Sequence, residues 1–512
     1  MQATFGKSMA WLHTWAGVCI GSLLFAVFWM GTLSVFASEI DRWMLPHTRV
    51  QAAQAPLSLD RIARAVTPSV PAGATQWRVD LPTAREPTLT LSWRDAKGAS
   101  GSCLLDPHSY ALLPEQGSAG ATGFFVPFHY SLHLQWLELG KWLVGLAAMA
   151  MLVLLVSGVI IHKKIFAQFF TFRPHKRLQR SALDLHNLCG VLALPFHFMI
   201  TLSGLIIFIT IYFPTAHLGV YGGGAKAKAA FSADAYGRFR RPLAGQPGQL
   251  DSLDAMQAVA EREWGGGQPY FVRVFNPGDA SSYVELRRSY AREVSMNLDQ
   301  IFFDGADGRV LHRFGAGPVM SVQRFVSGLH FIRFEHWVLR WLYFGGGLAG
   351  CVLIATGFLF WLEARRASHA RKGLAGVRVV SALAVGSVTG IMLATLAFLV
   401  ANRLLPPAAV LAETSLAPLA RAELEMGVFY LAWICAFVHA WLRAAGAWRE
   451  QAWALAGLAL LAALLNWFTT GDHPLQALAQ GRYQVAGVDL VLLATCALAL
   501  AAARRLGRVL AP

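Results

Sequence analysis

The chain has 512 residues, of which 55% are hydrophobic and only 14% are charged, and its net charge is +15. A soluble protein of this length cannot hide so much apolar surface, so a bilayer must solvate much of the chain. The sequence therefore predicts an integral membrane protein. We attribute the positive charge to anchoring at the membrane surface, not to nucleic-acid binding, because the basic residues gather in short loops between apolar segments.

Eight apolar segments are long enough to cross a bilayer. A helical span needs a largely uncharged run of about 18 residues or more. Such runs cover residues 9–36, 139–161, 186–213, 338–362, 378–401, 426–442, 452–470 and 485–503. The sequence therefore predicts a mainly α, polytopic helical membrane protein with about eight spans.

The basic loops predict the orientation of these spans, because short loops rich in Lys and Arg stay in the cytoplasm. These residues are Lys163, Lys164, Arg173, Lys176, Arg177 and Arg180 after the second span, Arg365, Arg366, Arg371, Lys372 and Arg378 after the fourth, and Arg504, Arg505 and Arg508 after the last. We therefore expect both termini in the cytoplasm. Two long polar segments, about 40–130 and 214–327, are expected on the outer side of the membrane.

The first two thirds of the chain contain one unit twice. Residues 1–165 and 180–366 each consist of a span, a polar segment and a span. Ser58 and Ser252 are placed to cap a helix at the start of each polar segment. Strand-like runs follow; in the second copy they cover about 270–276, 282–290, 297–303 and 309–313.

This pattern predicts an internally duplicated protein with two small α/β domains on the outer side of the membrane. Because both copies run in the same direction, we expect a pseudo-two-fold axis along the membrane normal. The remaining residues, 377–512, form a four-span tail with no third copy.

Histidines recur at matching places in the two copies. His13 and His186 each open a span in the pattern L-H-x-x-x-G, and His133 and His330 each follow a leucine before a later span. The expected axis brings His13 opposite His186 and His133 opposite His330. Facing imidazoles provide the two axial ligands of a haem iron. The chain lacks the C-x-x-C-H motif, so the sequence predicts two haems of the b type, without thioether links.

His197 is a fifth candidate ligand. It follows His186 by eleven positions, so on a straight helix both rings project from one face, roughly 16 Å apart. His197 either replaces His133 or His330 at the outer haem or lies between the haems. His129 and His133 form an i, i+4 pair that grips a divalent metal if that segment is helical, although no third ligand is evident.

The second polar segment is basic and partly aromatic. Its candidate substrate-binding residues are Arg238, Arg240, Arg241, Arg287, Arg288 and Tyr290. Such a surface attracts an anionic iron chelate; contact with lipid phosphates, or simple solvation, are the alternatives. The chain has no dinucleotide or Walker motif. Electrons must then come from a membrane quinol or a separate cytosolic reductase.

The paired L-H-x-x-x-G openings, the Leu-His positions and the outer α/β modules together resemble the PepSY-associated transmembrane family of iron-regulated inner-membrane proteins, over about residues 5–366. Within it, the chain looks most like ferric-siderophore reductases. The resemblance implies an oxidoreductase that holds haem b through His13, His186, His133 and His330 and reduces a ferric siderophore in the periplasm. The alternatives are a transporter of iron chelates and a non-catalytic scaffold that binds a periplasmic partner.

Overall fold

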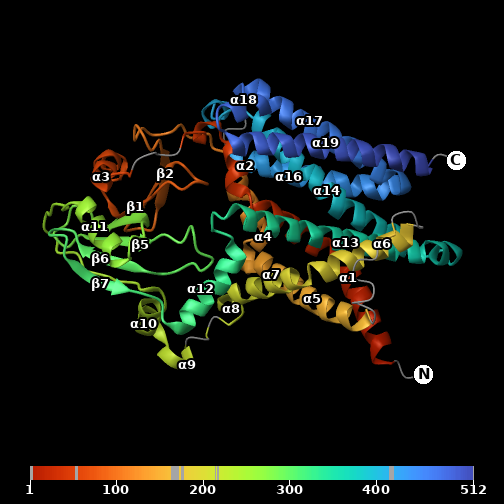
Figure 1. The fold of residues 1–512 in the computed structure, drawn as a ribbon, viewed down its shortest axis with the longest axis horizontal. Coiled ribbons are helices and arrows are strands. Elements are labelled where there is room, and N and C mark those ends of the chain that lie inside the picture. The colour runs from red at the N-terminus through yellow and green to blue at the C-terminus, as the bar shows by residue number, and fades with distance from the viewer. Residues whose placement is uncertain are drawn as a thin grey trace. The chain divides into compact units, whose positions relative to one another are not determined.

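The computed structural model describes residues 4–51, 56–162, 172–173, 178–213, 215, 218–413 and 420–510. The chain divides into two compact units (Figure 1). We call Met1–Pro46, Gln116–Leu205 and Val338–Pro512 the helical unit, and His47–Glu115 with Ile206–Trp337 the sheet unit. The basic residues Lys163, Lys164, Lys176 and Arg177 lie outside the described residues.

Seven helices within the described ranges are long and apolar enough to cross a membrane. They are α1 (Phe5–Ser34), α5 (Leu139–Ile161), α13 (Trp337–Arg371), α14 (Gly376–Leu404), α16 (Arg421–Arg443), α17 (Ala447–Thr470) and α19 (Tyr483–Leu510). They coincide with seven of the predicted spans. Figure 1 shows α1 beginning and α19 ending at the same end of the helical unit.

The remaining predicted span, 186–213, is broken. It forms α6 (Leu178–Leu192) and α7 (Leu194–Ile207), bent by 64°, and the short α8 (Ile209–Tyr212) follows. Pro195 lies in the first turn of α7, where its ring has no N–H to donate and clashes with the carbonyl one turn earlier. The prediction that His186 and His197 project from one face of a straight helix was therefore wrong.

The four-span tail belongs to the same core as the first repeat. In that core, α14 packs against α16, α17 and α1, and α19 contacts α2 (Ala37–Met44). Trp43 on α2 donates its Nε1 hydrogen to Asp489 over 2.7 Å, and Trp29 on α1 donates to Thr395 over 3.0 Å. The shorter helices α4 (Gly120–Ser131), α15 (Ala408–Leu411) and α18 (Pro474–Ala479) complete this unit.

The sheet unit contains one seven-stranded antiparallel sheet, ordered β3-β2-β1-β4-β5-β6-β7. Its strands are β1 (Ala74–Asp80), β2 (Leu89–Asp95), β3 (Ser100–Leu105), β4 (Pro269–Phe275), β5 (Tyr283–Arg288), β6 (Gln300–Asp304) and β7 (Val310–Phe314). The first three come from the first repeat and the other four lie close to the runs predicted in the second. Pairing of β1 with β4 joins the two predicted domains into one sheet, because each strand covers the other's open edge. Helices α9 (Leu218–Tyr221), α10 (Gly224–Tyr236) and α12 (Pro318–Phe331) also belong to this unit.

Two equivalent helices pack on one face of the sheet, and each one caps the other. Ser58 caps α3 (Leu59–Val66) and Ser252 caps α11 (Leu253–Glu263), as predicted. In addition, the Asp254 carboxylate accepts the Leu59 N–H over 2.6 Å, and the Asp60 carboxylate accepts the Leu253 N–H over 2.6 Å. Each acidic side chain thus satisfies the first turn of the other repeat's helix, where the helix dipole also favours it.

This exchange yields a prediction about stability. We expect Asp60→Ala or Asp254→Ala to lower the free energy of unfolding by about 1 kcal/mol, within the usual range for a lost N-cap. Urea unfolding of the full chain in detergent measures this change. Glu115→Ala removes an exposed carboxylate from the same unit and should have no effect; an equal loss in that control would contradict the capping role.

Candidate functional site

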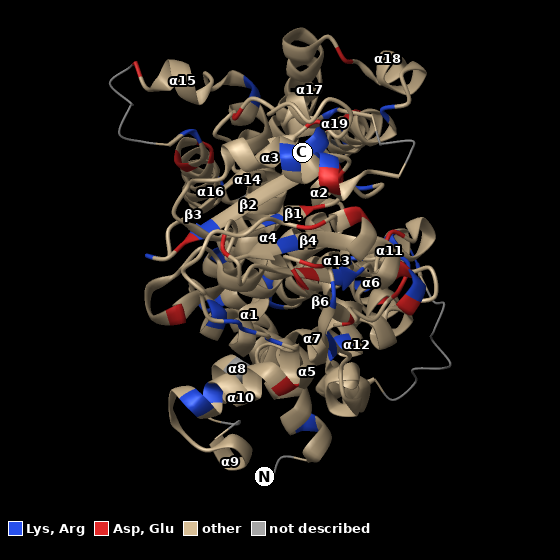
Figure 2. Cartoon of the chain, turned by 90° about the vertical axis from the view of Figure 1, so that its left-hand side faces the viewer, with Lys and Arg blue, Asp and Glu red and all other residues tan. Residues whose placement is uncertain are grey.

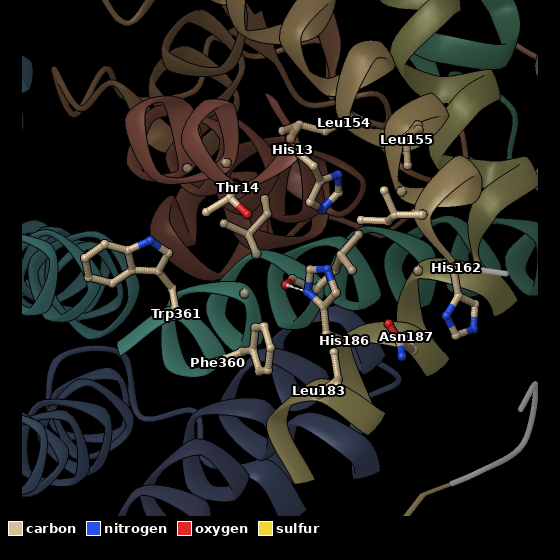
Figure 3. A pocket seen from close by; sticks show the side chains of 18 of the residues that line it. His13, Thr14, Leu154, Leu155, His162, Leu183, His186, Asn187, Phe360 and Trp361 are labelled. Carbon is tan, nitrogen blue, oxygen red and sulfur yellow. Dashed lines mark hydrogen bonds between the residues drawn. The ribbon is translucent and has the colours of Figure 1, made fainter. Parts of the chain in front are cut away.

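The helical unit contains a cavity of about 510 Å³ lined by residues of α1, α5, α6, the start of α7 and α13. His13 and His186 face each other across it (Figure 3). Their ring centroids are 6.2 Å apart and their ring planes are perpendicular, at 90°. The fold thus brings together the two histidines that the sequence repeat pairs.

A hydrogen bond fixes the tautomer of each ring. The Nδ1 of His186 lies 2.8 Å from the Leu353 carbonyl, which can only accept. The Nδ1 of His13 lies 3.0 Å from the Ser157 hydroxyl, whose own hydrogen goes to the Val153 carbonyl over 2.7 Å. Both Nδ1 atoms therefore carry the hydrogen, so each Nε2 keeps a lone pair. In Figure 3 the remaining ring nitrogens point toward each other across the cavity.

Each ring lies against a glycine of the neighbouring helix. A Cβ added to Gly158 on α5 would lie 3.2 Å from the Cε1 of His13, and one added to Gly357 on α13 would lie 3.3 Å from the Cε1 of His186. A side chain at either glycine would require the imidazole to move by a few tenths of an ångström.

The glycines of the two L-H-x-x-x-G patterns in turn lie against leucines of the same neighbouring helices. A Cβ added to Gly17 on α1 would lie 3.8 Å from Leu154, and one added to Gly190 on α6 would lie 3.2 Å from Leu353. The H-x-x-x-G segments therefore pack on L-x-x-S-G in α5 and L-x-x-T-G in α13. Each repeat thus contributes one histidine and the glycine against which its ring lies.

These contacts predict the effect of filling the glycine positions. We expect Gly158→Val or Gly357→Val to displace the adjacent imidazole and weaken haem binding by about 10- to 100-fold, the range typical of groups that orient a metal ligand. Haem titration of the purified apoprotein measures the affinity. Gly345→Val is the matched control on α13, because a Cβ there meets nothing within 4 Å; if it lost as much haem, the contacts would not be responsible.

The spacing of the two rings is compatible with a haem between them. A metal–imidazole bond is about 2 Å long, so two imidazoles that share one metal have ring centroids about 6 Å apart, close to the 6.2 Å found here. Within the described residues, no three His, Cys, Asp or Glu side chains gather to hold a metal ion. A pair of imidazoles suits a porphyrin instead, because the macrocycle brings its own equatorial nitrogens. The cavity wall is mostly apolar, as a haem requires.

His133 and His330 are not brought together within one unit. His133 follows the end of α4 in the left-handed region, with φ 56°. Its Nδ1 lies 3.0 Å from the Tyr430 hydroxyl and its Nε2 lies 3.0 Å from the Phe124 carbonyl, so this geometry leaves neither nitrogen for iron. His330 lies on α12 in the sheet unit. His129 lies on α4 and His133 beyond its end, so they do not form the helical i, i+4 pair either.

His129 and His197 each bond through one ring nitrogen to a backbone carbonyl of another helix, as His186 does. The Nδ1 of His129 lies 2.8 Å from the Val27 carbonyl, and its ring covers Gly31, four residues later. The Nε2 of His197 lies 3.2 Å from the Gly346 carbonyl.

The ring of His197 likewise covers a glycine four residues beyond that carbonyl, Gly350. His197 is fully buried, and its Nδ1 has no partner in the described chain. In the sequence, each of these two histidines is marked only by a glycine on the span that it faces. The repeat alone does not show which span that is.

The predicted substrate-binding residues do not form one open patch. Arg241 pairs with Asp304 over 3.0 Å, and Arg288 pairs with Asp299 over 2.8 Å and also with Glu293. Burial, together with nearby Tyr270, raises the pKa of Tyr290 to about 12, so it stays protonated. Of the other three, Arg287 bonds to Glu285 and Gln300, and Arg238 and Arg240 are exposed.

The fold and the cavity define a polytopic helical membrane protein with a duplicated core and a half-buried pair of facing imidazoles. The family model described as the PepSY-associated TM region matches residues 10–364. The chain therefore belongs to this family. It is also similar to an uncharacterized protein of Pseudomonas aeruginosa, with 28% identity over 409 residues that cover 73% of this chain and 92% of the relative.

Proposed function

We propose that this protein is a haem-containing reductase of the bacterial inner membrane that passes electrons to a ferric chelate, such as a ferric siderophore, in the periplasm. The observation that carries the proposal is the His13–His186 pair, with ring centroids 6.2 Å apart and each Nδ1 anchored. Both termini would lie in the cytoplasm, where the basic loops also lie.

The residues of the cavity have separate tasks in this proposal. A bound haem b supplies a one-electron carrier. His13 and His186 would hold this haem, and the hydrogen bonds of their Nδ1 atoms to Ser157 and Leu353 fix the orientation of the rings. The leucine side chains of the wall would surround the haem with apolar groups, which influence its reduction potential.

The protein would hold a second haem as well, because the hydrocarbon core is about 30 Å thick and one site near one surface does not cross it. We assign His197 as the leading candidate ligand, since its Nδ1 is buried without a partner in the described residues. His129 on α4 bonds in the same manner to the Val27 carbonyl of α1 and is a further candidate. The electron donor would be a membrane quinol or a cytosolic reductase.

One absorption experiment tests the proposal. The purified protein should show a b-type spectrum when oxidised that sharpens on reduction with dithionite. Adding a ferric siderophore to the reduced protein without oxygen should restore the oxidised spectrum and release Fe²⁺ to a ferrous-specific chelator. A colourless protein would overturn the proposal. Uptake of a labelled chelate into vesicles without any reductant would support the transporter instead.

A further inference from the structure

The face of the sheet opposite α3 and α11 carries three arginines, Arg78 on β1, Arg273 on β4 and Arg287 on β5, which we call the arginine cluster. Side chains alternate between the two faces of a strand. Val79 and Val272, which neighbour two of these arginines, point into the core under α3 and α11, so the arginines occupy the other face. Figure 2 shows basic positions on the central strands of this sheet.

Arg78 and Arg273 lie directly opposite each other on paired strands. They form the middle pair of the β1–β4 register, which runs from Gln76 opposite Phe275 to Asp80 opposite Phe271. Each repeat therefore contributes one arginine at the centre of the pseudo-two-fold arrangement. Like charges in directly opposed positions destabilise a sheet, so sheet stability alone gives no reason for this pair.

The three guanidinium groups crowd around one buried ring. Their carbons lie 3.9 Å (Arg78), 5.0 Å (Arg273) and 5.4 Å (Arg287) from the centroid of Phe271, which is fully buried. Stacking on the ring fixes the guanidinium planes, because cations are attracted to the aromatic face. The donors of the cluster are thus held in place before any ligand arrives.

The cluster has more positive than negative charge. Arg78 pairs with Asp80, whereas Arg273 and Arg287 share the single carboxylate of Glu285, each over 3.0 Å. Three arginines thus face two carboxylates. The Nε atoms of Arg273 and Arg287 are buried without a partner in the described chain. Burial and, more weakly, the charges of Arg78 and Arg287 lower the pKa of Arg273, against the pull of Glu285.

We infer that the arginine cluster is an anion-binding site, and that its ligand is a small ferric chelate with ionised carboxylate groups. This inference rests on the proposed function, which requires such a substrate, and of the binding residues expected from the sequence it keeps only Arg287. A carboxylate accepts hydrogen bonds from a guanidinium fork in two places and cancels the repulsion between Arg78 and Arg273. The cluster is reachable, because its side chains are 27%, 23% and 22% exposed.

Binding of gallium(III) citrate and ferric citrate to the purified full-length protein tests the site, because gallium does not undergo the redox step. We expect Arg78→Gln and Arg273→Gln each to weaken the binding of both complexes by at least about tenfold, the loss expected for one charge-assisted partner. Arg273→Lys, which keeps the charge but loses the fork, should lie in between. Arg94→Gln is the matched control, because it removes an exposed arginine from β2.

The outcomes separate this inference from the proposed function. The site is supported if Arg94→Gln binds like the wild type and both cluster variants bind more weakly. The haem spectra of all variants should be unchanged. If the ligand-free cluster variants unfold at a higher temperature than the wild type, Arg78 and Arg273 repel each other in the ligand-free protein. If the wild type binds neither complex, or if the cluster variants bind as well as the wild type, the inference is overturned, while a normal haem spectrum leaves the reductase proposal standing. If the protein is colourless but still binds gallium citrate through the cluster, the reductase proposal is overturned and the anion-binding site stands.

Discussion

The His13→Ala and His186→Ala variants are expected to lose the same haem and to keep their helical fold. Each variant removes one of two opposed imidazoles that are 6.2 Å apart, and a low-spin haem iron needs both. The fold should survive because the truncated side chain lines an existing cavity instead of a close-packed core. The haem-to-protein ratio, measured on the purified variants, should fall by the same amount in both.

Added imidazole provides a second measurement of the same prediction. It should enter the space left by either truncation and restore the low-spin spectrum, which loss of folding would not permit. His439→Ala is the control, because His439 lies on α16 and bonds to Glu450 over 2.8 Å, away from the cavity. Full haem occupancy in both cavity variants would refute the ligand assignment.

The Arg340→Met variant is expected to lower the free energy of unfolding by about 3–5 kcal/mol, the typical result of leaving one buried charge without its partner. Arg340 and Glu39 are 1% and 5% exposed, and their charged groups lie 2.7 Å apart. Arg340 also donates to the Val35 carbonyl over 3.0 Å and stacks on Phe36. These contacts connect α13 of the second repeat to α2 and the end of α1.

Thermal unfolding in detergent measures this loss. The double variant Glu39→Gln with Arg340→Met should be more stable than Arg340→Met alone, because it removes the uncompensated charge as well. The matched surface pair, Arg366 with Glu363, has an arginine side chain that is 68% exposed. Arg366→Met should therefore change stability by less than about 1 kcal/mol. Equal losses at the two positions would contradict the role of burial.

Local patterns predicted much of this fold. Seven spans form where uncharged runs exceed the thickness of a bilayer, because a helix is the way such a run satisfies its backbone in lipid. Ser58 and Ser252 cap the helices that follow them, since a hydroxyl in that position accepts a free backbone N–H. The repeat also placed His13 and His186 in equivalent positions, and the fold brings them together.

Contacts between distant segments decided the rest. The repeat pairs His133 with His330, but His133 bonds to Tyr430 and Phe124, and Tyr430 belongs to a tail that has no counterpart in the repeat. His197 lies beyond the bend between α6 and α7, and its neighbour Gly350 comes from α13. Such partners depend on how helices far apart in the chain are packed.

The sequence by itself determined a duplicated membrane protein, its spans, its capped helices and one pair of equivalent histidines, because each of these follows from residues close together in the chain. Only the tertiary structure decided that both long polar segments share one sheet and that Arg78 lies opposite Arg273. The physical reason is that strand register across the β1–β4 pair is set by long-range hydrogen bonding, which no local pattern specifies.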